Sequence, residues 1–382
     1  MKQSAIYLDH AAAAPLLPAA RDALVAAIEL AGNPSSVHGH GRKLRNLIEA
    51  ARDQVALLAG AERRQVVFTG SATEAITQAI VGGARAFAAS ALLVSAGEHT
   101  AVLKAAAATG LPVRPVGLRA DGQIDLDQLE AQLAQADAAN ETLLVALHWV
   151  NNETGVVQPV SRINALVGPT RHALFIDAAQ AFGKLPLDFA ASAPDMMAVG
   201  GHKIGAPAGV GALLVKSHAD EVRLIPGGGQ EQGRRGGTEA AALIAAFGAA
   251  ASAFPELYAA ADTSALVSRL ENGLNRMGAG AVVFGAERIG SITNFAIPGM
   301  ASATTMMALD LMGLSVSSGS ACSSGKVSSS HVLAAMDVAP EHASCALRVS
   351  FGWNSSAAEV DALLAALETI LQRHRAKQEH AA

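Results

Sequence analysis

Leu174-Phe175-Ile176-Asp177-Ala178-Ala179-Gln180 is a short apolar run that ends in a carboxylate. A run of this length and composition predicts a buried strand, with Asp177 at its C-terminal end. Parallel sheets bind ligands beyond the carboxyl ends of their strands, so Asp177 stands where a site is expected. A half-buried carboxylate at that edge requires a cationic partner.

Similar apolar runs alternate with longer alanine-rich helical patterns on both sides of this stretch. The alternation predicts an α/β fold with a mainly parallel sheet. The predicted strands span residues 66–69, 92–95, 143–148, 174–177, 196–199 and 210–215. The predicted helices, which have apolar residues at three-to-four spacing, span residues 42–59, 73–89, 100–109, 125–135 and 239–253.

The pattern changes beyond Pro255, where helices and short strands no longer alternate regularly. This change predicts a second, smaller domain. Its expected elements are a helix to about residue 277, strands at 282–284 and 292–297, and a final helix from residue 357.

The composition excludes several classes of protein. The 382 residues are 51% hydrophobic and 16% charged, with a net charge of -5, which excludes a disordered or nucleic acid-binding chain. The two cysteines, Cys322 and Cys345, exclude a disulfide framework and favour a cytoplasmic location. No apolar leader follows Met1, and the longest uncharged stretch, residues 289–309, holds polar residues, Pro and Gly, so we expect no membrane span.

Lys203, in Gly200-Gly201-His202-Lys203, directly follows an apolar strand. Desolvation at such a position makes a lysine nucleophilic. Lys203 and Asp177 together suit a lysine Schiff base to pyridoxal phosphate, with the carboxylate keeping the pyridine nitrogen protonated. The alternative is a solvated surface lysine and an unrelated capping aspartate.

Polar residues also follow other strands at the same edge of the sheet. The capping-box pattern of residues 71–74 opens a helix whose N–H groups at Ala72 and Thr73 suit a phosphate, although an ordinary capped turn is the alternative. His99 and Asn152 follow two further strands, where a ring-stacking imidazole and an amide donor are useful to a cofactor. A loop histidine and a turn asparagine are the alternatives.

Cys322 stands in the middle of Ser317-Ser318-Gly319-Ser320-Ala321-Cys322-Ser323-Ser324-Gly325. Structural cysteines are usually surrounded by large apolar residues, so this setting favours a thiolate that reaches a substrate. Cys345, among apolar neighbours, is interpreted as a packing residue.

Two segments that contain arginine are candidate anion-binding sites. Residues 227–239 are glycine-rich and contain Arg234 and Arg235, which suits a phosphate, a subunit interface or a plain connection. Arg348 lies in an apolar strand, where it requires either a substrate carboxylate or an internal salt-bridge partner.

Together these segments resemble the NifS/IscS-like cysteine desulfurases, which belong to the fold type I (class V aminotransferase) pyridoxal-phosphate enzymes. The resemblance runs nearly end to end. The cysteine segment is its most specific part, because aminotransferases of the same fold have no reason to have a thiol there. The matching segments are residues 7–9, 33–38, 73–74, 98–99, 151–153, 177–180, 202–203, 236–239, 317–325 and 330–333.

The resemblance implies a fold and an activity. It implies a large domain at residues 14–258 with a mainly parallel seven-stranded sheet, and a smaller α+β domain at residues 1–13 and 259–382 that includes the cysteine segment. The implied reaction converts L-cysteine to L-alanine and leaves a persulfide on Cys322. The sulfur then passes to an acceptor, such as an iron-sulfur scaffold protein, and a homodimer with shared active sites is implied.

The resemblance also assigns individual roles, with Cys322, Lys203 and His99 as catalytic residues. Asp177 would pair with the pyridinium, Gln180 and Asn152 would contact the ring oxygen, and His99 would stack on the ring. Lys203 would attach the cofactor and move the α-proton, and Ala72, Thr73 and His202 would contact the phosphate. Thr238 would contact the phosphate of the partner subunit, and Arg348 and Asn33 would bind the substrate.

The sequence departs from the family pattern at several positions, among them Gly200, Gly236 and Trp353. Gly200 and Gly236 stand where serine is usual, and Trp353 stands where arginine is common. These departures leave two alternatives open: a selenocysteine lyase or aminotransferase-type enzyme, and a weakly catalytic sulfur carrier or binding relative. No metal site is expected, because the scattered histidines lack ligand spacing.

Overall fold

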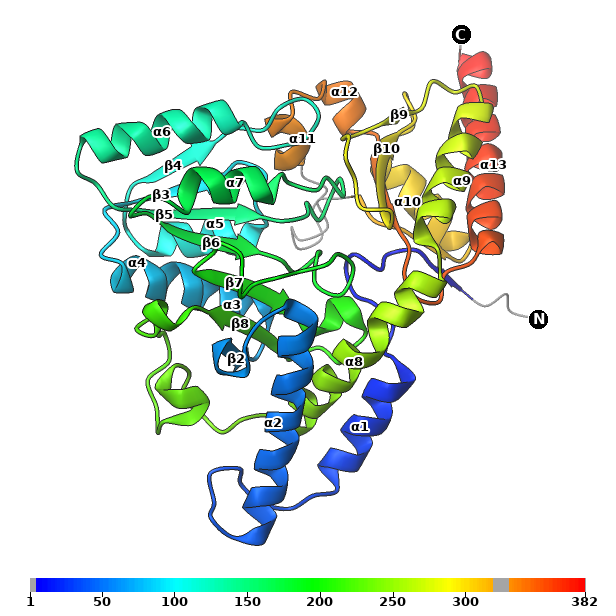
Figure 1. Cartoon of the computed structure of the whole chain (residues 1–382). Coiled ribbons are helices and arrows are strands. Elements are labelled where there is room, and N and C mark those ends of the chain that lie inside the picture. The colour runs from blue at the N-terminus through cyan, green and yellow to red at the C-terminus, as the bar shows by residue number, and fades with distance from the viewer. Residues whose placement is uncertain (1–4, 319–329, 382) are drawn as a thin grey trace.

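A seven-stranded sheet forms the centre of the computed structural model, which describes residues 5–318 and 330–381 (Figure 1). The strands are β2 (Val66–Thr69), β3 (Ala91–Ser95), β4 (Val113–Val116), β5 (Leu143–His148), β6 (Ala173–Asp177), β7 (Met196–Gly200) and β8 (Gly211–Val215). Their order is β2-β8-β7-β6-β5-β3-β4, and only β8 runs antiparallel to its neighbours within this sheet of the described chain. The predicted α/β class with a mainly parallel sheet is confirmed.

The central strands are buried on both faces, which explains their short apolar runs. In β6, Leu174 and Ile176 join one apolar cluster, whereas Phe175 joins the cluster on the opposite face. All six predicted strands form, with ends within one residue of the prediction. The prediction missed β4, because Arg114 and Pro115 interrupt its apolar pattern; β4 lies at the edge of the sheet, where proline is tolerated.

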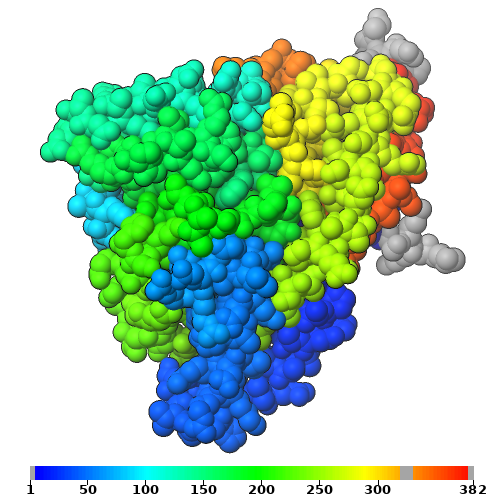
Figure 2. Space-filling view, in the orientation of Figure 1, coloured from blue at the N-terminus to red at the C-terminus, as the bar shows by residue number. Residues whose placement is uncertain are grey.

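Helices cover both faces of this sheet (Figure 1). They are α1 (Pro18–Ile28), α2 (Gly39–Ala59), α3 (Ala72–Thr77), α4 (Gly83–Ala86), α5 (Thr100–Ala108), α6 (Leu126–Ala138), α7 (Val160–Val167) and α8 (Ala241–Ala260). Helices α1 and α2 lie against α8, and the space-filling view shows their surfaces meeting on one face of the molecule (Figure 2). The sequence did not predict α1 or α7.

Two predicted helices differ in detail from the structure. The helix predicted at 73–89 includes a π-helical turn at Gln78–Gly82, where the buried Gln78 Nε2 donates to the carbonyl oxygens of Val222 and Arg234 at 2.9 and 3.1 Å. Helix α8 continues through Pro255 to Ala260, and the turns before the proline bury Phe247 and Phe254 in the core. By length and composition α8 could cross a membrane, but its buried face packs into the core, as in core helices of globular proteins.

The chain beyond α8 builds a separate layer with its own apolar cluster, which includes Leu270, Phe295 and Leu367. Its elements are α9 (Thr263–Arg276), β9 (Val282–Val283), β10 (Ile292–Ala296), α10 (Ser302–Leu311), β11 (Leu314–Ser315), α11 (His331–Ala335), α12 (Pro340–Ala343), β12 (Ala346–Ser350) and α13 (Ala357–Ala381). Strand β1 (Ile6–Tyr7) pairs with β11, so the start of the chain lies with this layer. This arrangement supports the division into 14–258 and 1–13 with 259–382, which we keep as a proposal.

Candidate active site

A pocket of about 320 Å³ lies beyond the carboxyl ends of the central strands. Most of the residues that the sequence predicted for a site line it, from segments that follow β2, β3, β5, β6, β7 and from β12. The predicted residues in its lining are Ala72, Thr73, His99, Asn152, Asp177, Gln180, His202, Lys203 and Arg348. The common direction of these strands brings Ala72 and Lys203 together, 131 positions apart, whereas Arg348 reaches the pocket from β12 in the three-stranded antiparallel sheet.

Three predicted residues do not line this pocket in the described chain. Asn33 is exposed in the connection between α1 and α2, where its Oδ1 accepts from the backbone N of Ser35 at 2.8 Å. Thr238 is also exposed, in the glycine-rich segment before α8. Cys322 lies outside the described residues. The roles of all three stay predictions.

Lys203 lies in a short 3₁₀ helix, Gly201–Ile204, directly after β7. Its Nζ donates to the carbonyl oxygens of Ala11 and Ala12 at 2.6 and 2.9 Å. Gln180 Nε2 donates to the same Ala11 oxygen at 2.8 Å. The segment before α1 therefore supplies backbone acceptors that hold both polar side chains in the pocket.

Asp177 ends β6 and is 8% exposed. Its Oδ1 accepts from the backbone N of Ala179 at 3.0 Å, which fixes the carboxylate at the start of the following turn. A carboxylate held here can pair with a cation inside the pocket.

His148, opposite Asp177 in the sheet register, forms a buried polar chain that the sequence did not reveal. Gln158 Oε1 accepts from the backbone N of Ile124 at 2.8 Å, so Gln158 Nε2 donates to His148 Nε2 at 3.1 Å. The His148 proton therefore lies on Nδ1 and is donated to Glu98 Oε1 at 2.6 Å. Burial raises the pKa of Glu98, and the His148 contact opposes that rise. The nearest signal in the sequence was the Glu98-His99 pair.

His99 is the N-cap of α5, and its Nδ1 accepts from the backbone N of Ala101 at 3.1 Å. In the neutral ring the proton therefore lies on Nε2. This cap fixes the plane of the imidazole at the pocket wall, as a stacking role requires.

The turn between β2 and α3 approaches β8 without room for side chains. Ser71 Oγ accepts from the backbone N of Glu74 at 3.1 Å, as the capping-box pattern predicted, but Glu74 Oε2 accepts from Gly70 N at 2.8 Å. A Cβ at Gly211 would lie 2.7 Å from Ala72 N. A Cβ at Gly200 would lie 3.2 Å from the Cβ of Ala72, so serine there requires only a small shift.

Arg348 is 3% exposed and combines both interpretations made from the sequence. Its Nη2 donates to Asp9 Oδ1 at 2.7 Å and its Nη1 donates to the carbonyl oxygen of Asn152 at 2.8 Å, which is an internal salt bridge. Its Nε has no hydrogen-bond partner among the described residues. Arg348 thus keeps one N–H group for an anion in the pocket. Asn152 lines the pocket, whereas Asn151 Oδ1 caps the turn at Glu153 N.

Burial, together with positive groups in and near the pocket, lowers the pKa values of two histidines. Burial, with the charges of Lys203 and Lys184, lowers the pKa of His202 to about 4. Burial, with the charge of Lys184, lowers the pKa of His10 to about 4. Both imidazoles are therefore neutral at pH 7, so Lys203 and Arg348 supply the positive charge that an incoming anion meets in the pocket.

The two arginines of the glycine-rich segment form salt bridges with carboxylates elsewhere in the chain. Arg235 Nε donates to Glu74 Oε1 at 2.8 Å, and Arg234 Nη2 donates to Asp220 Oδ1 at 2.6 Å. The missing serine hydroxyl at Gly236 has a steric reason, because a Cβ there would lie 2.5 Å from the Cα of Gly227. Trp353 has a structural role, since its Nε1 donates to the carbonyl oxygen of Pro15 at 3.1 Å.

The second cysteine is a structural residue. Cys345 is 5% exposed within an apolar cluster, which confirms its interpretation as a packing residue. In residues 5–318 and 330–381, no three His, Cys, Asp or Glu side chains are placed to hold a metal ion.

Comparisons with known proteins cover nearly the whole chain. Residues 6–363 match the family model of the aminotransferase class-V family. An IscS-like cysteine desulfurase from Mycobacterium tuberculosis is 36% identical over 390 aligned positions, which cover 97% of this chain and 97% of the relative.

Solved structures agree with this relationship. A NifS-like protein from Rickettsia africae superimposes with a TM-score of 0.86 at 29% identity, covering 96% of this chain and 99% of that one. The structure of SspA in complex with cysteine gives a TM-score of 0.80 at 30% identity, covering 92% and 100%. This chain belongs to the aminotransferase class-V family and is an enzyme of the cysteine desulfurase type.

Proposed function

We propose that this enzyme uses pyridoxal phosphate to convert L-cysteine to L-alanine and passes the sulfur through Cys322 to an acceptor. The observation that carries the proposal is the convergence of Asp177, Lys203 and Arg348 on one pocket of about 320 Å³. Enzymes of this family generally use pyridoxal phosphate. The structure of SspA in complex with cysteine supports cysteine as the substrate.

The donor set of the pocket fits this cofactor. Asp177 is a buried carboxylate suited to a protonated ring nitrogen, and Lys203 is the amine that would attach the carbonyl carbon. Gln180 would donate to the ring oxygen, and His99 would stack on the ring. The absence of a side chain at Gly211 lets β8 lie close to Ala72 N at the start of α3. The backbone N–H groups there, with the hydroxyl of Thr73, would bind the phosphate.

When bound, the cofactor supplies an electron sink for the charge left when the α-proton of the substrate is removed. Lys203 would move that proton, since its amine lies in the pocket. Arg348 would bind the substrate carboxylate through its unpartnered Nε, which orients the amino acid. Neutral His202 would donate to the phosphate without adding charge, because its pKa is about 4.

Cys322 would complete the reaction as a nucleophile. Its thiolate attacks the substrate sulfur, so that an S–S bond forms while the bond between sulfur and the β-carbon breaks. The electron pair left on carbon takes up a proton, and L-alanine leaves. The sulfur remains on Cys322 as a persulfide until an acceptor thiol removes it.

The test measures alanine and sulfide from L-cysteine, with pyridoxal phosphate and a reductant present. We expect both products in equal amounts from the wild type and their loss in Cys322→Ser. Cys345→Ala is the matched control, because it removes the other cysteine, which is buried away from solvent. Sulfide release that continues at the wild-type rate in Cys322→Ser would contradict the thiol mechanism.

A homodimer follows from the same proposal. Thr238 is exposed and outside the pocket of its own chain, which suits a contact with the phosphate of a second subunit. Mixing Lys203→Ala and Thr238→Ala chains tests this, because one of the two sites in each mixed dimer would regain both residues. Recovery of activity is expected on mixing, and none is expected if each chain works alone.

We also propose a cytoplasmic location and a role in iron-sulfur cluster assembly or thiolation. The acceptor would supply a thiol or cluster scaffold that accepts persulfide sulfur. Transfer of ³⁵S from labelled cysteine to a purified scaffold protein, with Cys322→Ser as control, measures this step.

A further inference from the structure

Lys184 lies four residues after Gln180, in the turn that follows β6. Its Nζ donates to Gln180 Oε1 at 2.9 Å. Gln180 Nε2 donates to the Ala11 carbonyl oxygen at 2.8 Å, and Lys203 Nζ donates to the same oxygen at 2.6 Å. A chain of hydrogen bonds therefore runs from Lys184 to the backbone group that Lys203 contacts.

This chain determines which way the Gln180 amide faces. A lysine ammonium only donates, so its partner on Gln180 must be the oxygen. The amide nitrogen must then face Ala11 and the pocket. Because one of its two N–H groups is used by Ala11, the other remains for a group inside the pocket.

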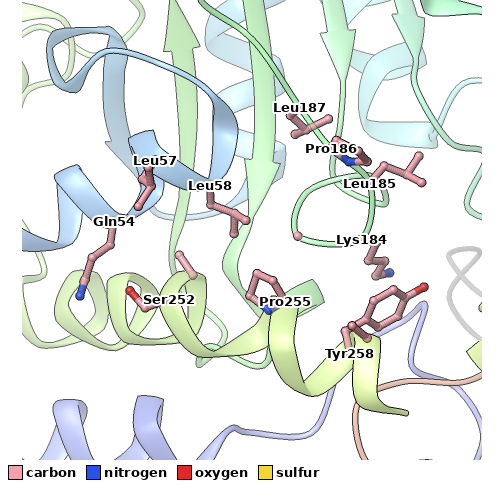
Figure 3. Close-up of a pocket in the computed structure, with 13 residues that line it drawn as sticks. Gln54, Leu57, Leu58, Lys184, Leu185, Pro186, Leu187, Ser252, Pro255 and Tyr258 are labelled. Atoms are coloured by element: carbon pink, nitrogen blue, oxygen red, sulfur yellow. The ribbon is translucent and has the colours of Figure 1, made fainter. Parts of the chain in front are cut away.

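Lys184 lies between the active-site pocket and a second cavity. That cavity, of about 560 Å³, lies between α2, the turn after β6 and α8, and Lys184 lines it together with Leu58, Pro255 and Tyr258 (Figure 3). In Figure 3 the Lys184 amine points away from Leu58 and toward Tyr258. Among the described residues that line this cavity there is no Asp or Glu.

The surroundings of Lys184 are otherwise positive. Lys203 and Arg348 repel its charge, and Lys184 in turn acts on His10 and His202. Burial, Lys203 and Arg348 together lower the pKa of Lys184 to about 7. A cation is kept here at a cost to stability, which favours a role in the site over a role in the fold.

We propose that Lys184 is a positioning residue, which holds the Gln180 amide so that it presents a donor to the ring oxygen of the bound cofactor. The proposal rests on the function proposed above. Without Lys184 only the bond to the Ala11 carbonyl oxygen holds the amide in this orientation. The amide would then turn more readily, and in the turned state its oxygen would face an oxygen of the cofactor. Lys184 itself contacts neither cofactor nor substrate.

The experiment measures the dissociation constant of pyridoxal phosphate by the absorption of the holoenzyme. We expect Lys184→Met to weaken binding about tenfold, the value of one charge-assisted hydrogen bond. Lys184→Arg, which keeps the charge and the donors, should restore most of the affinity. Unfolding of each apoprotein shows that it is folded, and Lys184→Ala serves as a second variant.

A double-mutant cycle separates positioning from a general effect on the pocket. In a Gln180→Ala background there is no amide to orient, so Lys184→Met should cause no further loss. Lys216→Met is the matched control, because it removes a lysine whose Nζ donates to a backbone carbonyl oxygen, that of Ala190, and which does not line the pocket. Equal losses in both backgrounds, or no loss in the wild-type background, would overturn the proposal.

Failure of this inference differs from failure of the proposed function. If the wild type binds the cofactor and releases sulfide but Lys184→Met binds as tightly, only the role of Lys184 is wrong. If the wild type forms no Lys203-dependent chromophore, the proposed function is wrong and the inference falls with it.

Discussion

The glycine-rich segment before α8 and the pocket at the sheet edge differ in the number of carboxylates that accompany their buried cations. In the first region each arginine meets a carboxylate. Arg52 and Glu231, with side chains 4% and 1% exposed, form two hydrogen bonds of 2.6 and 2.8 Å, and Arg235 meets Glu74. Such pairing satisfies the charges within the protein and joins the segment to α2 and α3.

In the pocket, cations outnumber carboxylates. Burial, followed by the charges of Lys203 and Arg348, lowers the pKa of Lys184, and burial, followed by the charges of Lys203 and Lys184, lowers the pKa of His202. Arg348 pairs with the carboxylate of Asp9, at 2.7 Å. Paired cations hold the fold together, whereas crowded cations leave room for the anions of a cofactor and a substrate.

The largest effect is expected when Lys203, a cation of the pocket, is removed. Lys203→Ala should lower kcat about a thousandfold, because loss of a general base usually costs this order of rate. Steady-state alanine production measures the change. Lys216→Ala, a lysine bound to a backbone carbonyl far from the pocket, should keep wild-type activity. A Lys203→Ala enzyme that keeps wild-type activity would contradict the claim that this pocket cation serves the reaction.

The next effect concerns the paired region. Glu231→Gln leaves Arg52 buried without its closest carboxylate and should lower the free energy of unfolding by about 3 kcal/mol. Urea unfolding of the apoprotein measures this, and activity per folded molecule should not change. Glu49→Gln is the matched control, since Glu49 also contacts Arg52, at 3.2 Å, but is 38% exposed. Similar losses in both variants would show that burial does not determine the cost.

How much of the fold the sequence predicts depends on how strongly each element is buried. Strands such as β6 are covered on both faces, so their apolar runs are unbroken and their ends were predicted closely. Helix α1 buries only Ala20 and Ala27, which leaves a weak apolar pattern. The π-helical turn in 78–82 depends on contacts of Gln78 with Val222 and Arg234, which no local pattern contains.

The same reasoning applies to the site. Asp177, His99 and His202 follow strands, so topology alone places them together. Lys184 and His148 were missed because their importance comes from hydrogen bonds, not from a motif. The link from Gln180 to Ala11 joins residues 169 positions apart. The i, i+4 spacing of Gln180 and Lys184 was the available signal.

The crowding of cations also predicts a dependence of stability on pH. The pKa of Lys184 falls from 10.5 to about 7 on folding, so between these values the unfolded chain binds more protons than the folded one. Stability therefore gains from this group as pH rises through that window, by at most about 1.4 kcal/mol per pH unit, and the penalty is complete below pH 7.

Lys184→Met removes this titration. The variant should be more stable than the wild type at neutral pH, and the difference should shrink as the pH rises toward 10.5. Urea unfolding of both apoproteins across the window measures the difference, in which the other titrating groups cancel. A difference that does not vary with pH would show that Lys184 is not a crowded cation.

The smallest effect is expected for the Arg235–Glu74 pair, whose burial lies between that of Arg52–Glu231 and that of Arg223–Glu221. Arg235 and Glu74 are each 20% exposed, so water screens their attraction more than that of the Arg52 pair. Glu74→Gln should cost about 1 kcal/mol, which includes a weakened bond to the backbone N of Gly70. Glu221→Gln, in a pair where Glu221 is 77% exposed, should cost less in the same urea titration. Losses that follow burial would confirm that pairing in this region serves stability, whereas a Glu74→Gln loss as large as that of Glu231→Gln would show that burial does not determine how much each pair contributes.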